Sequence, residues 1–292
     1  MKKAGKTDPQ KLICESGVVP SLPIIYARIN KAVNDPTSSM TSIGEIISKD
    51  MGLSARLLRM ANSAFYNFPS RIDTISQAVI VIGIEQIRDL ALGTSVIELF
   101  EGIPRHLVSM ESFWRHSMTC GLTARMLAVH RREINVERYF VAGLLHDIGR
   151  LIIYMKIPGQ ASEALSRCKT TGEFLYQAER EIMGFHHAEV GGALMQYWKL
   201  PATLTEAVAF HHHPLDSNHS SVDASTIHVA DIIANAMELG SSGERCIPSL
   251  VPEAWEQLGL STSVLEPTLN EVDRQFHDII EVFLEPVSKL LP

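Results

Sequence analysis

The stretch AGLLHDIGRLI, residues 142–152, carries an adjacent histidine and aspartate inside an apolar helical pattern. Its apolar residues recur at the spacing of one helix face, so the stretch is predicted to pack on a buried core. Gly149 is predicted to end this helix. Side chains at adjacent helical positions point about 100° apart, yet His146 and Asp147 can still reach one metal ion at the helix flank. A His-Asp dipeptide also arises by chance, so the rest of the chain has to decide.

Two further histidines stand where leucines are expected. Leu204, Ala207, Val208, His211 and His212 repeat at positions i, i+3, i+4, i+7 and i+8, which is the buried face of a helix. Burying an imidazole costs free energy unless the ring gains a partner, and a metal ion is the strongest partner available. The pair therefore indicates a metal site.

Three more segments place metal-capable groups at the edge of an apolar stripe. His187 opens an amphipathic helical segment, and Asp231 shares a stripe with Ile227. His116 precedes Cys120 by one helical turn. Cys120 either approaches that histidine or serves as a small buried apolar residue.

The prediction of a metal site rests on the whole set, because a lone buried histidine is more often hydrogen-bonded in a core than metallated. Imidazole and carboxylate ligands together suit Zn, Fe, Mn or Ni, and mixed sites also hold Mg. The predicted ligands of one or two divalent ions are His116, His146, Asp147, His187, His211, His212 and Asp231. The remaining histidines fall into three groups. We expect surface or loop positions for His106, His130, His219 and His277, and a supporting or solvated position for His186 and His213. We expect His228 to support Asp231.

Composition limits the class of protein. With 292 residues, 46% hydrophobic and 20% charged, the chain is long and apolar enough to bury a sizeable core. The formal net charge of −7 argues against a broad nucleic-acid-binding face. No signal peptide and no membrane span is evident. The four cysteines form no CxxC pair, which argues against a zinc knuckle or a disulfide framework and favours the cytoplasm.

Helical periodicity dominates the chain and no sustained period-2 alternation is found, so the predicted fold class is all-α. Capping boxes are predicted at Ser42 with Glu45, Thr170 with Glu173, and Thr203 with Glu206, and Gly83 is predicted to end a helix in a left-handed conformation. The expected organisation is a poorly anchored tail at 1–19, an N-terminal helical lobe at 20–104, and a metal-binding lobe with closing helices at 105–292.

The order of these motifs resembles the HD superfamily of metal-dependent phosphohydrolases, and most closely its HDOD branch, the HD-related output domain of bacterial signalling proteins. The segments that carry the resemblance, in chain order from about residue 18 to 285, are VVPSLPIIYARI, DMGLSARLLRMANSAFY, ISQAVIVIGIEQIRDLAL, FWRHSM, AGLLHDIGRLI, GFHHAEVGGALMQYWKLP, AVAFHHHP and IHVADIIA. The resemblance implies a two-lobed helical fold, in which an N-terminal lobe packs on an HD-like lobe.

The resemblance also implies roles for the candidate ligands. The basic HD metal set would be His116, His146, Asp147 and Asp231, and the positions that add a second metal in dinuclear relatives match His187, His211 and His212. Many HDOD proteins lack several of these ligands, whereas this chain keeps all of them. The Gly-Tyr-Pro triplet of cyclic-di-GMP phosphodiesterases is absent, since residues 213–216 read His-Pro-Leu-Asp, so hydrolysis of cyclic di-GMP is not expected.

Two functions follow from the resemblance. The first is a signalling output or regulatory module with a divalent metal site and a protein partner, for which Arg56 and Arg59 are candidate contacts unless they line a solvated helix face. The second is an active phosphohydrolase on a nucleotide or phosphoester, in which Asp147 bridges the metals or positions the nucleophile. In it Arg150, or less directly Arg115, reaches a phosphate, unless Arg150 is a solvated side chain at a helix end. A di-iron oxygenase built on the same ligands is a third, weaker hypothesis.

Overall fold

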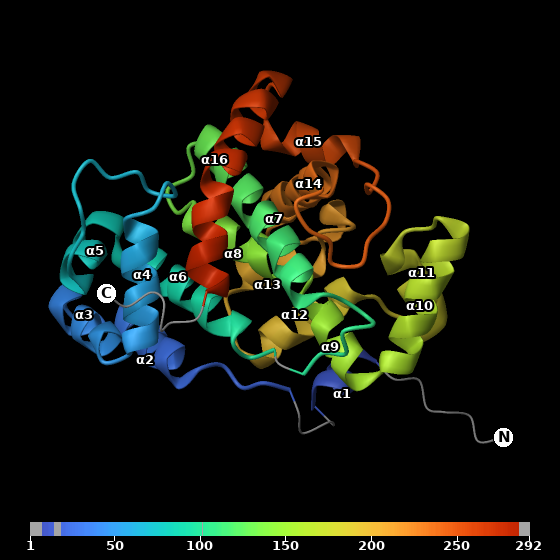
Figure 1. Cartoon of the computed structure of the whole chain (residues 1–292), viewed down its shortest axis with the longest axis horizontal. Helices are drawn as coiled ribbons and strands as arrows, with labels where there is room; N and C mark the ends of the chain where they lie inside the picture. Colours follow the sequence, from blue (N-terminus) through green and yellow to red (C-terminus); the bar gives the residue numbers. More distant parts are fainter. Residues whose placement is uncertain (1–7, 15–18, 101, 286–292) are drawn as a thin grey trace.

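The computed structural model describes residues 8–14, 19–100 and 102–285, and these residues form helices joined by turns and loops (Figure 1). They contain no strand, so the all-α prediction is confirmed. The helices are α1 Pro9–Cys14, α2 Ile24–Val33, α3 Met40–Ser48, α4 Met51–Ala61, α5 Ile75–Ile82, α6 Ile84–Ile97, α7 Met110–His130, α8 Glu137–Leu145, α9 Ile148–Lys156, α10 Pro158–Thr171, α11 Leu175–Met183, α12 His187–Tyr197, α13 Ala202–Ala209, the 3-10 helix η1 Pro214–Asp216, α14 Ser221–Met237, α15 Pro252–Leu258, the 3-10 helix η2 Thr262–Val264 and α16 Leu265–Leu284. Among the described helices, none is both long and apolar enough to cross a bilayer.

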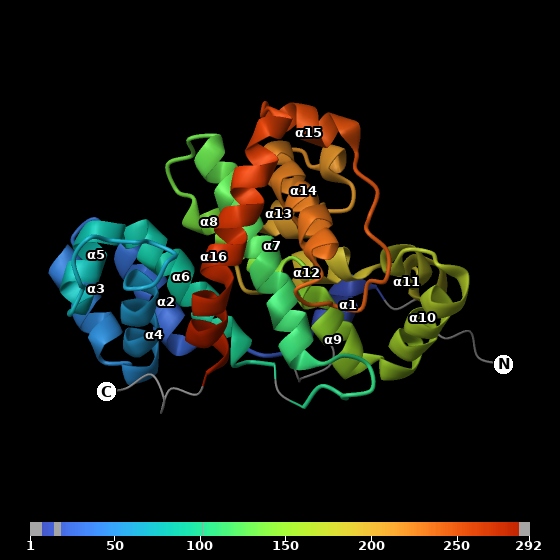
Figure 2. The same ribbon diagram turned by 45° about the horizontal axis from the view of Figure 1, so that its top comes forward.

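Helices α2 to α6 form one end of the molecule, and α10 and α11 form the other (Figures 1 and 2). Between these ends lies α7, with α8 and α16 packed along it, and α16 also contacts α4. One cluster of buried apolar side chains extends through the N-terminal helices, α7, α9, α12 and α16. The predicted division into lobes at 20–104 and 105–292 therefore separates regions that share a core, and the boundary itself stays a prediction.

The N-terminal segment is better anchored than the sequence indicated. Leu12 and Ile13 of α1 are 6% and 2% exposed, and α1 packs on α12. The indole Nε1 of Trp198 donates a hydrogen bond to the carbonyl of Pro20. The prediction of a poorly anchored tail is therefore wrong for Pro9–Cys14, because two adjacent apolar residues suffice to dock one short helix. The rest of that prediction, at 1–7 and 15–18, lies outside the described residues.

The three predicted capping boxes are wrong. Helix α3 begins one turn earlier than expected, with Ser39 as the N-cap and Ser42 as its reciprocal partner. Thr170 lies in the last turn of α10, and Thr203 lies inside α13, which begins after Pro201. The spacing that defines a capping box is a local pattern that also occurs within helices, so it does not identify a helix start on its own.

The predicted apolar stripes at 53–61 and 75–82 are confirmed as α4 and α5. Gly83 ends α5 as predicted, but with φ 105° and ψ 152°, which lies outside the left-handed helical region. The reason is that Gly83 is also the N-cap of α6, so the chain turns directly from one helix into the next.

Gly149 does not end a helix. Helix α8 ends at Leu145, His146 and Asp147 form the turn, and α9 begins at Ile148. A Cβ atom at Gly149 would lie 2.0 Å from the carbonyl oxygen of His187, the first residue of α12. Gly149 therefore permits close contact between α9 and α12, which brings the turn against the start of α12.

A second close contact joins α7 and α8. A Cβ atom on Gly121 would lie 2.6 Å from the carbonyl oxygen of Phe140, and one on Gly143 would lie 2.7 Å from the Cα of Gly121. Both glycines lie one or two turns from a predicted ligand, Gly121 from His116 on α7 and Gly143 from the turn after α8. The packing of the two helices thus sets the separation of His116 and His146.

The two arginines proposed as partner contacts on α4 are engaged within the chain. Arg56 is 7% exposed and pairs with Glu98 of α6. Arg59 pairs with Glu281 on α16 and lies 3.4 Å from Glu285 just after it. Each arginine therefore neutralises a carboxylate of a neighbouring segment, although Arg59 also lines the groove on α4 that is described next.

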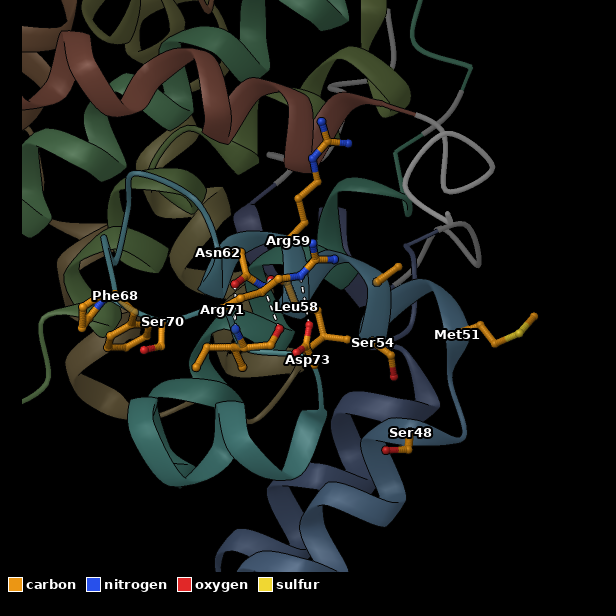
Figure 3. A pocket seen from close by; sticks show the side chains of 13 residues that line it. Ser48, Met51, Ser54, Leu58, Arg59, Asn62, Phe68, Ser70, Arg71 and Asp73 are labelled. Carbon is orange, nitrogen blue, oxygen red and sulfur yellow. Dashed lines mark hydrogen bonds and ion pairs between the residues drawn. The ribbon is translucent and has the colours of Figure 1, made fainter.

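A groove of about 930 Å³ lies between α4 and the loop that precedes α5 (Figure 3). Its two arginines are Arg59, paired as above, and Arg71, whose Nε lies 2.9 Å from Asp73 Oδ1. None of the seven predicted metal ligands lines this groove. Although this groove is large, it is therefore not the candidate metal site.

Candidate metal centre

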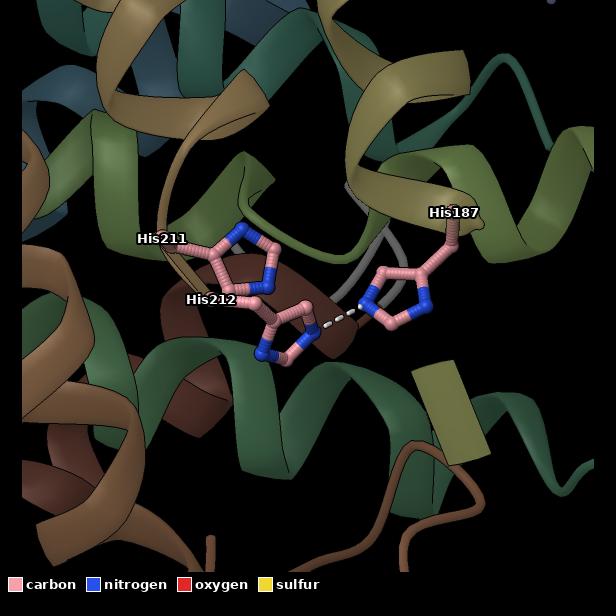
Figure 4. Close-up of side chains that lie close together, drawn as sticks. All are labelled: His187, His211 and His212. Carbon is pink, nitrogen blue, oxygen red and sulfur yellow. Dashed lines mark hydrogen bonds between the residues drawn. The ribbon is translucent and has the colours of Figure 1, made fainter. Parts of the chain in front are cut away.

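The seven predicted ligands lie together at the centre of the helical assembly. They come from α7, the α8–α9 turn, the first residue of α12, the segment after α13, and α14. Their ligand atoms form three overlapping trios, each with all atoms within 4.8 Å of one another, and Figure 4 shows one of these. The trios are His116 with His146 and Asp231, His146 with Asp147 and His211, and His187 with His211 and His212.

Asp147 lies between two groups of imidazoles. Its Oδ2 is 3.3 Å from His146 Nε2 and 3.8 Å from His116 Nε2. Its Oδ1 is 3.0 Å from His187 Nε2 and 3.9 Å from His211 Nε2. A single carboxylate therefore has one oxygen directed at each half of the cluster.

Asp231 completes the half that contains His116 and His146. Its Oδ1 is 3.1 Å from His116 Nε2 and 3.4 Å from His146 Nε2. The side-chain amide of Asn235, one turn further along α14, donates a 2.8 Å hydrogen bond to the same oxygen. This contact holds the carboxylate in its orientation.

Backbone carbonyls determine which nitrogen of two histidines faces the cluster. The Nδ1 of His146 donates to the carbonyl of Gly143 at 2.7 Å, and that of His211 donates to the carbonyl of Val208 at 2.8 Å. In the neutral form of each ring, Nε2 therefore carries a lone pair directed inward. Such a hydrogen bond on the far nitrogen is the usual arrangement of a metal-bound histidine.

Glu179 of α11 gives the same support to His187, and sequence analysis missed it. The Glu179 Oε2 accepts hydrogen bonds from the His187 backbone N–H at 2.9 Å and from its Nδ1 at 2.6 Å. Glu179 is only 1% exposed. Nothing local distinguishes it from the other acidic residues of α11, because its role arises only when α11 packs beside the start of α12.

The cluster has the chemistry of a cation site. Within the described residues, the buried polar atoms here that make no hydrogen bond include both ring nitrogens of His116, Nε2 of His146 and His211, and both carboxylate oxygens of Asp147, whose contacts with His187 and Arg150 are ion pairs. A buried polar atom without a partner costs about 1–3 kcal/mol. A divalent cation would satisfy several of these atoms at once, and nitrogen with oxygen ligands suits Zn, Fe, Mn or Ni. The residues present therefore fit one or two such ions.

Burial keeps two of the imidazoles neutral. Burial, together with His146 and His187 nearby, lowers the pKa of His211 to about 3. Burial and the adjacent His211 likewise lower the pKa of His212 well below its ordinary value. Neutral imidazole is the form that binds a metal ion, so these two rings need lose no proton at neutral pH.

The charged groups of the cluster reinforce one another. Burial opposes the charge on Asp147, but Arg150, His146 and His187 outweigh it and hold the pKa of that carboxyl well below its ordinary value. Burial also opposes a charge on His146, but the Asp147 carboxylate outweighs it and raises the pKa of His146 well above the ordinary value. A proton on His146 therefore competes with any metal ion for its Nε2.

Comparison with known proteins identifies the fold that carries this cluster. The family model of the HDOD domain matches residues 19–214. The chain belongs to the HDOD family. Its resemblance to that family in sequence is thereby confirmed over most of the chain.

Two crystal structures resemble this HDOD protein along nearly its whole length. An HDOD domain protein of unknown function from Geobacter sulfurreducens is 26% identical, with a TM-score of 0.74 over 97% of this chain and 98% of that one. A protein from Shewanella amazonensis SB2B, provisionally assigned as a phosphohydrolase, is 26% identical, with a TM-score of 0.72 over 97% of each chain.

An uncharacterized protein from Treponema pallidum (strain Nichols) is 26% identical over 205 residues. The match covers 67% of this HDOD chain but only 38% of that protein. The chain therefore spans well under half the length of this relative, and the likeness concerns one part of it.

Arg150 of the HDOD chain, predicted to reach a phosphate, lies inside the protein. It is 2% exposed, with its Nε 3.1 Å from Asp147 Oδ1 and its Nη1 donating a 2.8 Å hydrogen bond to Ser242 Oγ. The guanidinium therefore holds Asp147 in place, and its predicted contact with a phosphate stays a prediction. Arg115 donates to the carbonyl of Leu239 and lies over the ring of Phe276.

The remaining histidines of the HDOD chain mostly lie where expected. His228 is buried, but its Nδ1 donates to the carbonyl of His211 at 2.8 Å, so it supports that ligand instead of Asp231. His186 is also buried, at 3% exposure. His130 is half-buried, and the exposed ones are His106, His213, His219 and His277. Cys120 is buried in an apolar cluster, which agrees with the expectation that it serves as a small buried apolar residue.

Aromatic rings cover one end of the cluster. The ring of Tyr176 on α11 stacks on His212, with centroids 4.3 Å apart and an interplanar angle of 17°. Phe174 stacks in turn on Tyr176 at 6.0 Å. His212 is consequently only 6% exposed, although it lies nearest this edge of the HDOD fold.

Proposed function

We propose that this chain is a regulatory module of bacterial signal transduction whose HDOD fold holds one or two divalent cations. The observation that carries the proposal is the convergence on Asp147 of buried nitrogen and oxygen atoms, several of which make no hydrogen bond. One ion would be held by His116, His146, Asp147 and Asp231, and a second by Asp147 with His187, His211 and His212. Such an ion, when bound, neutralises phosphoryl oxygens and acidifies a coordinated water.

Burial of the ligands supports a regulatory role over catalysis. None of the seven residues is more than 6% exposed. A turnover site has to admit a substrate, whereas a structural or sensory ion is best held away from solvent. The signalling partner, a phosphate-containing ligand and a cytoplasmic location expected from the sequence belong to this proposal, and the acidic net charge makes nucleic acid an improbable partner.

Metal content and metal titration test the proposal. Elemental analysis of purified protein and calorimetric titration with Mn²⁺, Zn²⁺, Fe²⁺ and Ni²⁺ should reveal at least one bound ion. His146→Ala combined with Asp231→Asn should weaken that binding at least tenfold, because it removes two ligands of one half. His277→Ala, on an exposed part of α16, is the matched control. The proposal fails if the wild type binds no ion or if both variants bind equally well.

The alternative is an active metal-dependent phosphohydrolase, and the Shewanella relative with its provisional assignment favours it. In that case Asp147 would position the attacking water, and Arg150 would turn from Asp147 to the phosphate. Metal-loaded protein would then hydrolyse a generic phosphoester, and Asp147→Asn would abolish turnover. Such a result would show that the protein is an enzyme and not only a regulatory module, and it would still support the proposed metal site.

A further inference from the structure

A second cavity, of about 600 Å³, lies away from the metal ligands. Its walls are one face of α10, the loop 241–245 and the segment just before α7. None of the seven predicted ligands lines it. The residues that do are His106, Leu107, Ser162, Leu165, Ser166, Lys169, Ser241, Gly243, Glu244 and Arg245.

The cations of this pocket are not neutralised. Within the described residues, the side chains of Lys169, Arg245 and His106 form no ion pair. The larger groove on α4 differs, because its arginines are paired with Glu281 and Asp73. Two unpaired cations, Lys169 and Arg245, thus line one hollow in a chain whose net charge is −7.

The one carboxylate in the lining, that of Glu244, is buried and already hydrogen-bonded. The Glu244 side chain is 3% exposed, and its oxygens accept hydrogen bonds from the backbone N–H groups of Leu175 and Arg245. The hydroxyls of Ser162 and Ser166 on α10 add donors on the wall that carries Lys169. The pocket thus offers basic groups and hydroxyls, and its acid is already hydrogen-bonded.

We propose that this pocket binds a small ligand through its phosphate or diphosphate group. An arginine fork and a lysine ammonium are the groups that recognise phosphate, and hydroxyls complete its hydrogen bonds. Small-ligand sites have volumes of about 300–1,000 Å³, so the cavity is large enough for the rest of such a molecule. The site does not depend on the presence of a metal ion.

The loop 241–245, one wall of the pocket, contacts Arg150 beside the candidate metal centre. Ser242 Oγ accepts the hydrogen bond from Arg150, which contacts Asp147, and the carbonyl of Ser242 accepts one from the hydroxyl of Tyr154. A ligand bound between Arg245 and Lys169 would therefore touch the segment next to Arg150. A regulatory ligand at this phosphate site could therefore change the position of Asp147 through Ser242 and Arg150.

Calorimetric titration of the full chain with inorganic pyrophosphate tests the site. Lys169→Gln combined with Arg245→Gln should weaken binding at least tenfold. The matched control is Lys31→Gln combined with Lys49→Gln, which removes the same charge from exposed positions on and after other helices and should leave the affinity within twofold. Equal affinity of the two double variants would overturn the proposal, as would no binding at millimolar pyrophosphate.

A third variant separates this site from the metal centre. His146→Ala combined with Asp231→Asn should bind pyrophosphate as the wild type does, because neither residue lines the pocket. If this variant loses pyrophosphate binding while the Lys169 and Arg245 variant retains it, the anion binds at the metal centre. That result would overturn the phosphate pocket and leave the proposed metal site standing.

Discussion

Asp147 is the residue on which the two halves of the candidate centre meet. Its two oxygens face His146 on one side and His187 on the other, and Arg150 contacts it from a third direction. A carboxylate surrounded in this way stays ionised although it is 1% exposed. At the scale of single residues, the orientation of the candidate ligands depends on carbonyl and carboxylate oxygens that accept hydrogen bonds from their far ring nitrogens.

Glu179 provides the sharpest test of that orientation. Glu179→Gln keeps the size of the side chain but removes the charge that stabilises the Nδ1–H of His187. Loss of such a supporting contact typically weakens metal binding by about 10–100-fold, and we expect a decrease in that range by calorimetry. Glu181→Gln, on the same helix but 60% exposed at its side chain, is the control. Equal affinities for the two variants would show that Glu179 does not position His187.

Protons should compete with the metal ion. The pKa values of His146 and His187 are raised, so the unbound rings keep a proton above pH 6.5, and that proton has to leave when the metal binds. Apparent metal affinity should therefore increase as the pH rises from 6 to 8, with proton release measurable as a buffer-dependent heat. An affinity that is constant over this range would contradict the assigned protonation.

Helix contacts through glycine decide how the ligand-bearing segments meet. Helices α9 and α12 approach at Gly149, and α7 and α8 approach at Gly121 and Gly143. None of these three glycines is required by a turn or by a positive φ, since all lie within helices with ordinary backbone angles. At the scale of elements, close backbone packing and not helix termination explains why they are glycines.

A methyl group at Gly149 should separate α9 from α12. Gly149→Ala would place its Cβ 2.0 Å from the His187 carbonyl, so the helices have to shift, at a cost of about 1–3 kcal/mol by the usual penalty for overpacking. Urea denaturation should show this loss of unfolding free energy. Gly159→Ala in α10, whose Cβ would meet nothing within 4 Å, should leave stability unchanged or raise it slightly. If both variants unfold at the same urea concentration, the contact between Gly149 and the His187 carbonyl leaves room for a methyl group, contrary to this prediction.

The whole molecule behaves as one packed unit around the centre. The core cluster joins the N-terminal helices to α7, α9, α12 and α16, and Arg59 ties α4 to α16. Because the candidate ligands come from five segments of this unit, a bound ion should stabilise all of it and not a local region.

Thermal unfolding measures that global effect. An ion present at about 100 times its dissociation constant adds about 2.7 kcal/mol of stability. Mn²⁺ or Zn²⁺ should therefore raise the Tm of the wild type in a single transition. The His146→Ala, Asp231→Asn variant should show no such increase. A rise of equal size in both proteins would place the stabilising ion elsewhere.

Sequence alone determined the all-α class, the amphipathic stripes of α4 and α5, and the seven polar groups that interrupt apolar patterns. These features are local, because helix periodicity is set by 3.6 residues per turn. The predicted helix through His211 and His212 was wrong, since α13 ends at Ala209 and both histidines lie in the turn that follows. The first residues of helices were harder to predict from sequence. Ser42 was predicted as the N-cap of α3, but the N-cap is Ser39, since several local patterns compete at each helix end.

Only the tertiary structure decided which groups support the ligands and which are free to bind something else. Glu179, Ser242 and Arg150 take their roles from contacts between different segments, and the ion pair of Arg59 with Glu281 of α16 is likewise a contact that the sequence did not indicate. The phosphate pocket likewise arises where α10 meets the loop after α14. Charge neutralisation, hydrogen bonding and burial depend on distances between elements, and periodicity carries no information about those distances.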